Sequence, residues 1–198
     1  MLSPDQLKDT NSNTTIGVQM EDRHELPTGG VLHDADVDFL LWLNQLSRWE
    51  PVAIFFRIIS RLGDGVFWYS LMAVLFFQQM YLPALHMVVV ALTGLIVYRL
   101  VKSGTKRPRP YVDNPRVILQ ARPLDEYSFP SGHTLHAVSL TLVSLYYYPV
   151  LGIFLVPFVL LIMLSRCVLG LHYPSDVMAG ASAGLIIASL SFVLAGLL

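Results

Sequence analysis

The feature that most constrains the fold is a series of long apolar runs between residues 65 and 198. A helix needs roughly 20 mostly apolar residues to cross the ~30 Å hydrocarbon layer of a bilayer. The first and third of five such runs look short, which implies tilt or local thinning of the bilayer. We expect an all-α fold, a polytopic bundle of about five transmembrane helices. The expected spans are residues 65–80, 82–101, 133–148, 150–168 and 177–198.

The composition is that of an integral membrane protein. Hydrophobic residues make up 54% of the chain and charged residues 14%, against about a quarter charged in soluble domains. No basic segment followed by an apolar region and a small-residue cleavage site opens the chain, so we expect no cleavable signal peptide. The single cysteine, Cys167, excludes an internal disulfide and is expected to be a packing residue.

The N-terminal part of the chain is more polar than the rest. Residues 1–36 cannot bury enough apolar surface to fold alone, which predicts a polar tail. Residues 37–62 carry apolar side chains at helical spacing, interrupted by five charges and by Pro51. We expect interfacial amphipathic helices here, with helices packed on the end of the bundle as the alternative. Residues 63–198 then form the transmembrane domain.

The polar segments are expected to share one face of the membrane. If five helices alternate in direction, the tail, residues 102–131 and residues 165–176 all fall on that face. All 13 Lys and Arg residues lie on or near it. The net charge of -1 gives no information on partners because the charges are segregated along the chain. We expect the bilayer and a membrane lipid as partners, no nucleic acid and no cofactor, and leave the oligomeric state open.

The first polar motif is Lys-Ser-Gly-Thr-Lys-Arg-Pro-Arg-Pro at residues 102–110, where the second span ends. Lys102 and Arg109 are seven residues apart, about two helical turns, so both cations can face one point. The alternative is a basic cluster that binds anionic headgroups.

The second motif, Phe-Pro-Ser-Gly-His-Thr at residues 129–134, opens the third span. Ser131 is a reasonable N-cap, and Gly132 lets backbone N–H groups approach an oxyanion, so this helix start can cradle a phosphate. His133 would lie beside that anion. An interfacial histidine at an ordinary helix start is the alternative.

The third motif spans residues 165–176, between two very apolar runs. Arg166 offers a planar fork of donors that matches phosphate oxygens. His172 lies just before the last span, and Asp176 one turn later can hold one imidazole nitrogen and leave the other free to attack. The alternative is a surface arginine and a His-Asp pair that satisfies a helix end.

Together the motifs read K-x6-R-P, P-S-G-H and S-R-x5-H-x3-D, in that order. This pattern resembles the type 2 phosphatidic acid phosphatase (PAP2) superfamily, and the resemblance covers roughly residues 60–198. It implies that His172 attacks phosphorus to give a phosphohistidine and that Asp176 orients it. His133 would protonate the leaving group and then assist water. The residues implied to hold the phosphate oxygens are Lys102, Arg109, Ser131, Gly132 and Arg166.

The resemblance also implies a reaction without a metal, and the sequence offers no carboxylate cluster for Mg²⁺. The expected function is hydrolysis of a lipid phosphate or diphosphate, such as undecaprenyl diphosphate, phosphatidylglycerol phosphate or phosphatidic acid. Transfer of the phosphoryl group to another lipid is a close variant. A non-catalytic lipid-phosphate binder or flippase is the runner-up, although binding alone does not need an oriented nucleophile and a second histidine.

The protein is expected in the cell (inner) membrane with its site at one face. The resemblance implies the extracytoplasmic face, whereas the positive-inside rule favours the cytoplasmic one. Residues 111–127 form a loop that either covers the site or is a solvated connector. His136 is a candidate to support the site from behind, and His86 is expected to be a packed, hydrogen-bonded residue.

Overall fold

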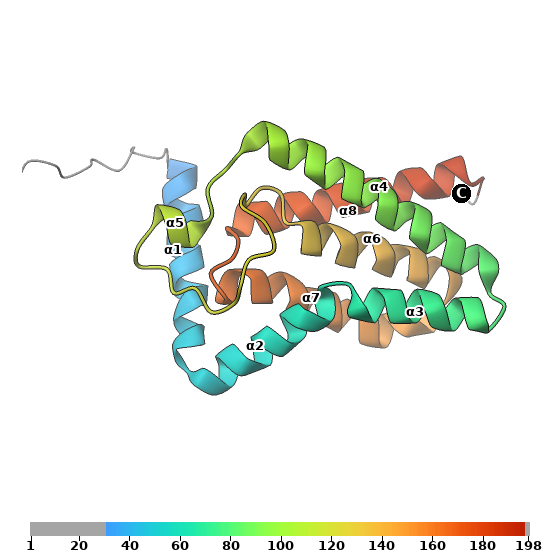
Figure 1. The fold of residues 1–198 in the computed structure, drawn as a ribbon, viewed down its shortest axis with the longest axis horizontal. Helices are drawn as coiled ribbons and strands as arrows, with labels where there is room; N and C mark the ends of the chain where they lie inside the picture. The colour runs from blue at the N-terminus through green and yellow to red at the C-terminus, as the bar shows by residue number, and fades with distance from the viewer. Residues whose placement is uncertain (1–30, 197–198) are drawn as a thin grey trace, which may run out of the picture. The chain divides into compact units, whose positions relative to one another are not determined.

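A computed structural model of the chain describes residues 31–196, and every regular element in that part is a helix (Figure 1). The all-helical prediction is therefore correct for this part of the chain. In chain order the elements are α1 (Val31–Asn44), the 3₁₀ helix η2 (Gln45–Arg48), α2 (Glu50–Gly63), α3 (Val66–Phe77), α4 (Tyr81–Thr105), α5 (Pro110–Asp113), α6 (Gly132–Tyr147), the 3₁₀ helix η3 (Pro149–Leu151), α7 (Gly152–Val168) and α8 (Pro174–Leu194).

The count of membrane spans differs from the prediction. Three segments within residues 31–196 are long and apolar enough to cross a membrane: Tyr81–Asp113, Pro149–Val168 and Pro174–Leu194. A fourth is available if α2 and α3, which are bent by 43° at a short break, cross together. Helix α3 has 12 residues and α6 has 16, so neither reaches the ~20 residues that a span requires alone. By length and composition alone, three or four candidate spans are found, and the two helices that do not qualify by themselves, α3 and α6, are the two runs that were expected to be short.

Helix α6 is the centre of the bundle and packs against α4, α7 and α8. Two glycines of α8 permit its close approach. A Cβ on Gly180 would lie 2.5 Å from the carbonyl oxygen of Ser131, and one on Gly184 would lie 2.6 Å from that of Leu135. Small residues such as these let membrane helices approach closely. The contact presses the start of α6 against the first turns of α8, which brings the second motif beside the third.

The opposite end of the bundle is tied together by His86. Its ring lies between the hydroxyl groups of Tyr147, at 3.1 Å, and Ser191, at 2.9 Å, so it joins α4, α6 and α8. This is the packed, hydrogen-bonded role expected for His86. Cys167 is buried on α7, as expected for a packing residue.

Helix α1 lies across the end of the bundle that carries the motifs (Figure 1). It begins at Val31, so residues 31–36 of the predicted tail are helical, while residues 1–30 lie outside the described residues. Asp36, which was expected in the tail, is a contact residue of this helix. Its carboxylate accepts hydrogen bonds from the backbone N–H of Ser175, at 2.9 Å, and from Arg107 Nη2, also at 2.9 Å.

Helices α1 and α2 pack on the bundle, as in the second of the two arrangements considered for this segment, and their placement at the membrane interface stays a prediction. Helix α1 contacts α7 and α8, and α2 contacts α7. The buried residues of α2 recur at helical spacing, from Ala53 through Phe56 and Ser60 to Gly63. Large apolar side chains remain exposed around α2, and one of them is Trp49, which immediately precedes the helix and is 69% exposed.

Candidate active site

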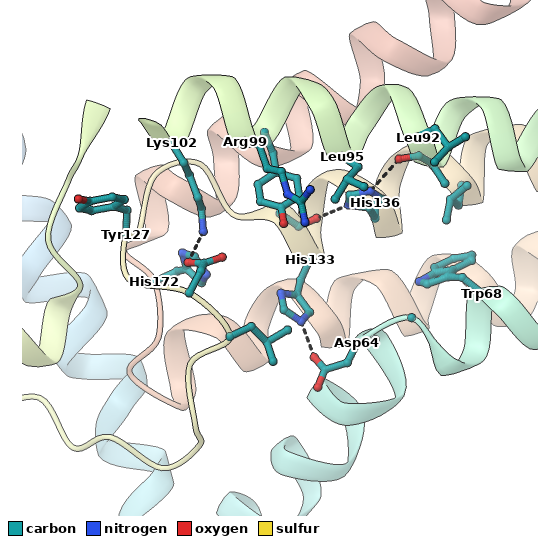
Figure 2. Close-up of a pocket in the computed structure, with 18 of the residues that line it drawn as sticks. Asp64, Trp68, Leu92, Leu95, Arg99, Lys102, Tyr127, His133, His136 and His172 are labelled. Carbon is teal, nitrogen blue, oxygen red and sulfur yellow. Dashed lines mark hydrogen bonds and ion pairs between the residues drawn. The ribbon is translucent and has the colours of Figure 1, made fainter. Parts of the chain in front are cut away.

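The three motifs meet at one end of the bundle, around a cavity of about 700 Å³ (Figure 2). They meet because α4 and α7 end where α6 and α8 begin. The predicted site residues that line the cavity are Lys102, Arg109, Gly132, His133 and His172. The remaining three, Ser131, Arg166 and Asp176, do not line it and are almost completely buried.

His172 lies in the short loop between α7 and α8 and is 1% exposed. Its Nε2 lies 3.4 Å from Nη1 of Arg109. An arginine can only donate, so Nε2 is the unprotonated nitrogen and its lone pair accepts this long contact from Arg109. Burial lowers the pKa of His172 well below its ordinary value, and the charges of Arg166, Arg109 and Lys102 lower it further. The ring is therefore neutral near pH 7, which is the form that can attack phosphorus.

Asp176 lies on the other side of the His172 ring, with Oδ2 3.6 Å from Nδ1. That distance is too long for a hydrogen bond, and Nδ1 has no hydrogen-bond partner among residues 31–196. The same carboxylate closes the start of α8, where Oδ2 accepts the N–H of Tyr173 at 2.9 Å. The pair is close enough for electrostatic orientation, and such contacts often tighten when substrate binds.

Arg107 holds the other oxygen of Asp176 and was not predicted as a site residue. Its Nη1 donates to Asp176 Oδ1 at 2.6 Å, and its Nη2 donates to Asp36. The guanidinium also lies over the ring of Tyr173, 4.1 Å from the centroid. Arg107 therefore neutralises a fully buried carboxylate. Its place between Lys102 and Arg109 in the first motif was the only signal.

His133 lies at the first turn of α6 and is paired with Asp64 (Figure 2). Its Nε2 contacts Oδ1 of Asp64, in the turn between α2 and α3. A carboxylate accepts, so Nε2–H donates and Nδ1 is left for the reaction. Asp64 was missed by the sequence reasoning. The available signal was a carboxylate flanked by Gly63 and Gly65 between two helices.

Arg166 is held by α2. Its Nη1 donates to Oγ of Ser60 at 2.5 Å, and its Nε has no hydrogen-bond partner among residues 31–196. The guanidinium is 2% exposed. Ser60 and Asp64 are one turn apart, so α2 supports one predicted phosphate-binding residue and the second histidine.

Lys102 and Arg109 share a carboxylate. Oδ1 of Asp125 accepts from Lys102 Nζ at 2.5 Å and from Arg109 Nη2 at 2.6 Å. Although burial raises the pKa of Asp125, the two cations hold it below its ordinary value. The loop that carries Asp125 lines the cavity through residues 124–127. This loop covers the site, one of its two expected roles, and an anion already lies between the two predicted phosphate-binding cations.

The start of α6 is fixed from several sides. Ser131 is at the N-cap position, but its side chain makes no capping bond and its Oγ instead accepts from Thr134 at 3.0 Å. The N–H of Ser131 donates to the backbone oxygen of Asp176 at 3.0 Å. His136 lies between the carbonyl oxygens of Gly132, at 2.9 Å, and Ala91, at 3.1 Å. His136 therefore supports the site from behind by tying the first turn of α6 to α4.

An apolar trough leaves the site along the seam between α3 and α4. Trp68 and Met72 line it from α3, and Leu92 and Val88 line it from α4. A second cavity of about 460 Å³ shares Met72 and Val88 and continues to Phe76, at the far end of α3. Leu92 is 54% exposed, so the trough is open toward the side of the bundle.

No group of three or more His, Cys, Asp or Glu residues within residues 31–196 is placed to hold a metal ion. The chemistry of the cavity is carried by two histidines, their carboxylates and several cations. This set suits nucleophilic attack on a bound anion.

Known proteins are similar in sequence to this chain over most of its length. Residues 83–197, more than half of the chain, match the family model of the PAP2 superfamily. The chain is 30% identical over 158 residues to an undecaprenyl-diphosphatase of Sulfolobus acidocaldarius, covering 77% of this chain and 73% of that protein. It is 28% identical over 168 residues to phosphatidylglycerophosphatase B of Bacillus subtilis, covering 74% of this chain and 72% of that protein.

The fold also has a solved counterpart. A crystal structure of a transmembrane PAP2-type phosphatidylglycerolphosphate phosphatase from Bacillus subtilis superposes with a TM-score of 0.72 at 23% identity, covering 85% of this chain and 88% of that chain. The likeness shows that the helices around the cavity follow the arrangement of a transmembrane PAP2 protein. The chain therefore belongs to the PAP2 superfamily and is a multi-pass membrane enzyme, a lipid phosphate or diphosphate phosphatase.

Proposed function

We propose that the protein hydrolyses a lipid phosphate or diphosphate through a phosphohistidine on His172, without a metal. The observation that carries this proposal is the buried imidazole of His172, which lines a cavity together with Lys102 and Arg109. Its unprotonated nitrogen lies 3.4 Å from Arg109. A binder or flippase would need the cations but not this nucleophile.

In the first step the lone pair of His172 Nε2 attacks the terminal phosphorus. The bond between that phosphorus and the oxygen on the lipid side breaks, and its electron pair stays on that oxygen. His133 supplies a proton to it where the leaving group is an alkoxide. Lys102 and Arg109, which line the cavity, stabilise the charge that develops on the other phosphate oxygens, and the buried Arg166 adds its positive charge from behind the cavity wall. The phosphate must displace the carboxylate of Asp125 from its position between Lys102 and Arg109.

In the second step a water molecule attacks the phosphohistidine. His133 takes a proton from the water, the P–N bond breaks, and its electron pair returns to Nε2. The products are inorganic phosphate and the lipid alcohol, or the lipid monophosphate when the substrate is a diphosphate. A lipid hydroxyl in place of water would make the same enzyme a phosphotransferase.

The lipid is proposed to be a polyprenyl diphosphate of the undecaprenyl class, with phosphatidylglycerol phosphate and phosphatidic acid as the other candidates. The trough between α3 and α4 supports this choice because it follows a single helix seam, which suits one long chain better than two acyl chains. A relative at 30% identity is named undecaprenyl-diphosphatase. The phosphate end of such a lipid would lie at the polar end of the bundle.

The site is proposed to face the extracytoplasmic side. The positive-inside count favours the other face, but Lys102, Arg109 and Arg166 are buried within the site and reflect its chemistry. Labelling of Val112→Cys in intact cells with a membrane-impermeant maleimide tests this, because Val112 is 66% exposed near the site and the native Cys167 is buried. Protection from the reagent until the membrane is opened would reverse the assignment.

The experiment that tests the function measures phosphate release by the purified full-length protein in detergent with EDTA. Its substrates are undecaprenyl diphosphate, phosphatidylglycerol phosphate, phosphatidic acid and a soluble phosphate ester. We expect release from the polyprenyl diphosphate far above the rest, its loss in His172→Ala, and its retention in the control variant His33→Gln. Full hydrolysis by His172→Ala, or a strict need for Mg²⁺, would contradict the mechanism. No release from any lipid would favour the binder or flippase.

A further inference from the structure

Arg99 is a cation of the cavity that the proposed mechanism does not use. It lies on α4, one helical turn before Lys102, and both residues line the cavity. Residues three apart on a helix share a face. Figure 2 shows Lys102, Arg99, Leu95 and Leu92 following one another along α4.

The other cations of the site have protein partners. Lys102 and Arg109 bind Asp125, Arg107 bridges Asp36 and Asp176, and Arg166 donates to Ser60. Within residues 31–196, Arg99 has no hydrogen bond or ion pair, and its side chain is exposed. Its positive charge is therefore available to a ligand in the cavity.

The order of residues along α4 matches the order of groups in a lipid diphosphate. Val88, Leu92 and Leu95 line the trough, Arg99 follows, and Lys102 lies nearest the nucleophile. A helix rises about 1.5 Å per residue, so Arg99 lies roughly 4.5 Å nearer the trough than Lys102. A hydrocarbon chain in the trough and a terminal phosphate at His172 would place the lipid-linked phosphate between them, beside Arg99.

Resting on the proposed function, we propose that Arg99 binds the lipid-linked phosphate of a diphosphate substrate and so selects diphosphates over monophosphates. The guanidinium fork suits phosphate oxygens. When His172 attacks the terminal phosphorus, the bridging P–O bond breaks and the lipid monophosphate leaves with the electron pair. Arg99 stabilises the negative charge that this group gains. A monophosphate substrate has no such group and makes no use of Arg99.

The competing role for Arg99 is an anchor to headgroups. Long basic side chains near helix ends often extend to the membrane interface. Such an anchor would not distinguish one substrate from another, because it acts on the position of α4. The two roles therefore predict different values for one ratio, kcat/KM for the diphosphate divided by kcat/KM for the monophosphate.

The experiment compares a polyprenyl diphosphate with the monophosphate of the same chain length, in the purified full-length protein and in Arg99→Leu. We expect kcat/KM for the diphosphate to fall about tenfold to a hundredfold, the loss typical of a charge-assisted hydrogen bond to phosphate. The monophosphate should change by less than about threefold on the same grounds. Arg99→Lys should restore part of the preference because it keeps the charge.

Two further measurements keep the result independent of folding. Inhibition by vanadate, a single-phosphate analogue, should be unchanged in Arg99→Leu, whereas inhibition by methylenediphosphonate should weaken. Arg116→Leu removes an exposed cation that does not line the cavity. The ratio of its kcat/KM values for the diphosphate and the monophosphate should equal that of the wild type.

Equal losses for both lipids in Arg99→Leu, which leave the ratio unchanged, would overturn the inference in favour of the anchor, and wild-type kcat/KM for both lipids would overturn it outright. Either result leaves the proposed function standing. If the wild-type protein hydrolyses neither lipid, the proposed function itself is contradicted.

Discussion

Asp64 accepts a hydrogen bond from Nε2 of His133, although 69 positions separate the two residues in the chain. The pairing fixes the ring of His133, because Nε2 is held by Asp64 and Nδ1 is left for the reaction. Asp64 is thus a positioning residue contributed by the turn that follows α2.

Asp64→Asn is expected to lower kcat by about tenfold to a hundredfold, part of the 10²–10⁴ that general acid–base catalysis supplies. Phosphate release measures kcat, and vanadate inhibition reports whether the phosphate site is intact. Asp38→Asn, at an exposed position of α1, is the matched control. Normal turnover by Asp64→Asn across the pH range would remove this role.

His133→Gln should harm different substrates to different extents. An ester substrate expels an alkoxide that needs a proton, whereas a diphosphate expels a phosphate that leaves readily as an anion. We expect kcat/KM for a lipid monophosphate to fall by about 10²–10⁴ and that for the diphosphate by much less. The value of kcat/KM reports only the steps up to formation of the phosphohistidine. Hydrolysis of that intermediate, which is common to both substrates, therefore does not affect the comparison. Equal losses would argue against a leaving-group role.

The acid limb of the pH profile should follow the charges around His172. Burial and the neighbouring cations lower the pKa of His172, so the attacking neutral ring persists below the ordinary pKa of histidine. Lys102→Met removes one of these charges, raises the pKa and should move the acid limb of kcat/KM to higher pH. The same lipid is used for both proteins, so the ionisation of its phosphate cancels. A shift to lower pH would contradict the assignment of His172 as the neutral nucleophile.

Arg107→Met should lower the free energy of unfolding of the protein as well as its activity. It leaves the fully buried Asp176 without its guanidinium partner, a change that typically costs about 3–5 kcal/mol. Thermal unfolding in detergent measures the loss. The double variant Arg107→Met with Asp176→Asn should recover part of it, because position 176 then carries no unpaired charge, although Asp36 still lacks its guanidinium partner. Absence of any recovery would mean that Arg107 acts mainly through Asp36 or Tyr173.

The sequence predicted the fold class well because apolar runs determine where helices form. It also predicted that the first and third runs would be short, and the corresponding helices, α3 with 12 residues and α6 with 16, are the two that do not qualify as spans by length alone. The predicted N-terminal helical segment began too late, because Asp36 was assigned to the polar tail. Its role becomes visible only when Ser175, 139 positions later, is brought beside it.

The proximity of the candidate site residues was predictable where they lie close in sequence. His172 and Asp176 are one turn apart, and Lys102 and Arg109 share one motif. The supporting residues Ser60, Asp64 and Asp125 were not found, because each acts on a residue that only the tertiary fold brings near. Arg107 was read as one charge in a basic cluster, and its two carboxylate partners come from α1 and α8.

The open side of the trough between α3 and α4 gives the enzyme a two-dimensional supply of substrate. A lipid can slide laterally from the bilayer leaflet along Leu92 and Val88 and never enter the aqueous phase. Velocity should then depend on the mole fraction of substrate in the membrane plane, so diluting the lipid with inert phospholipid slows turnover even when the total amount in the vessel is constant. For this protein the bilayer is the reaction medium as well as the support.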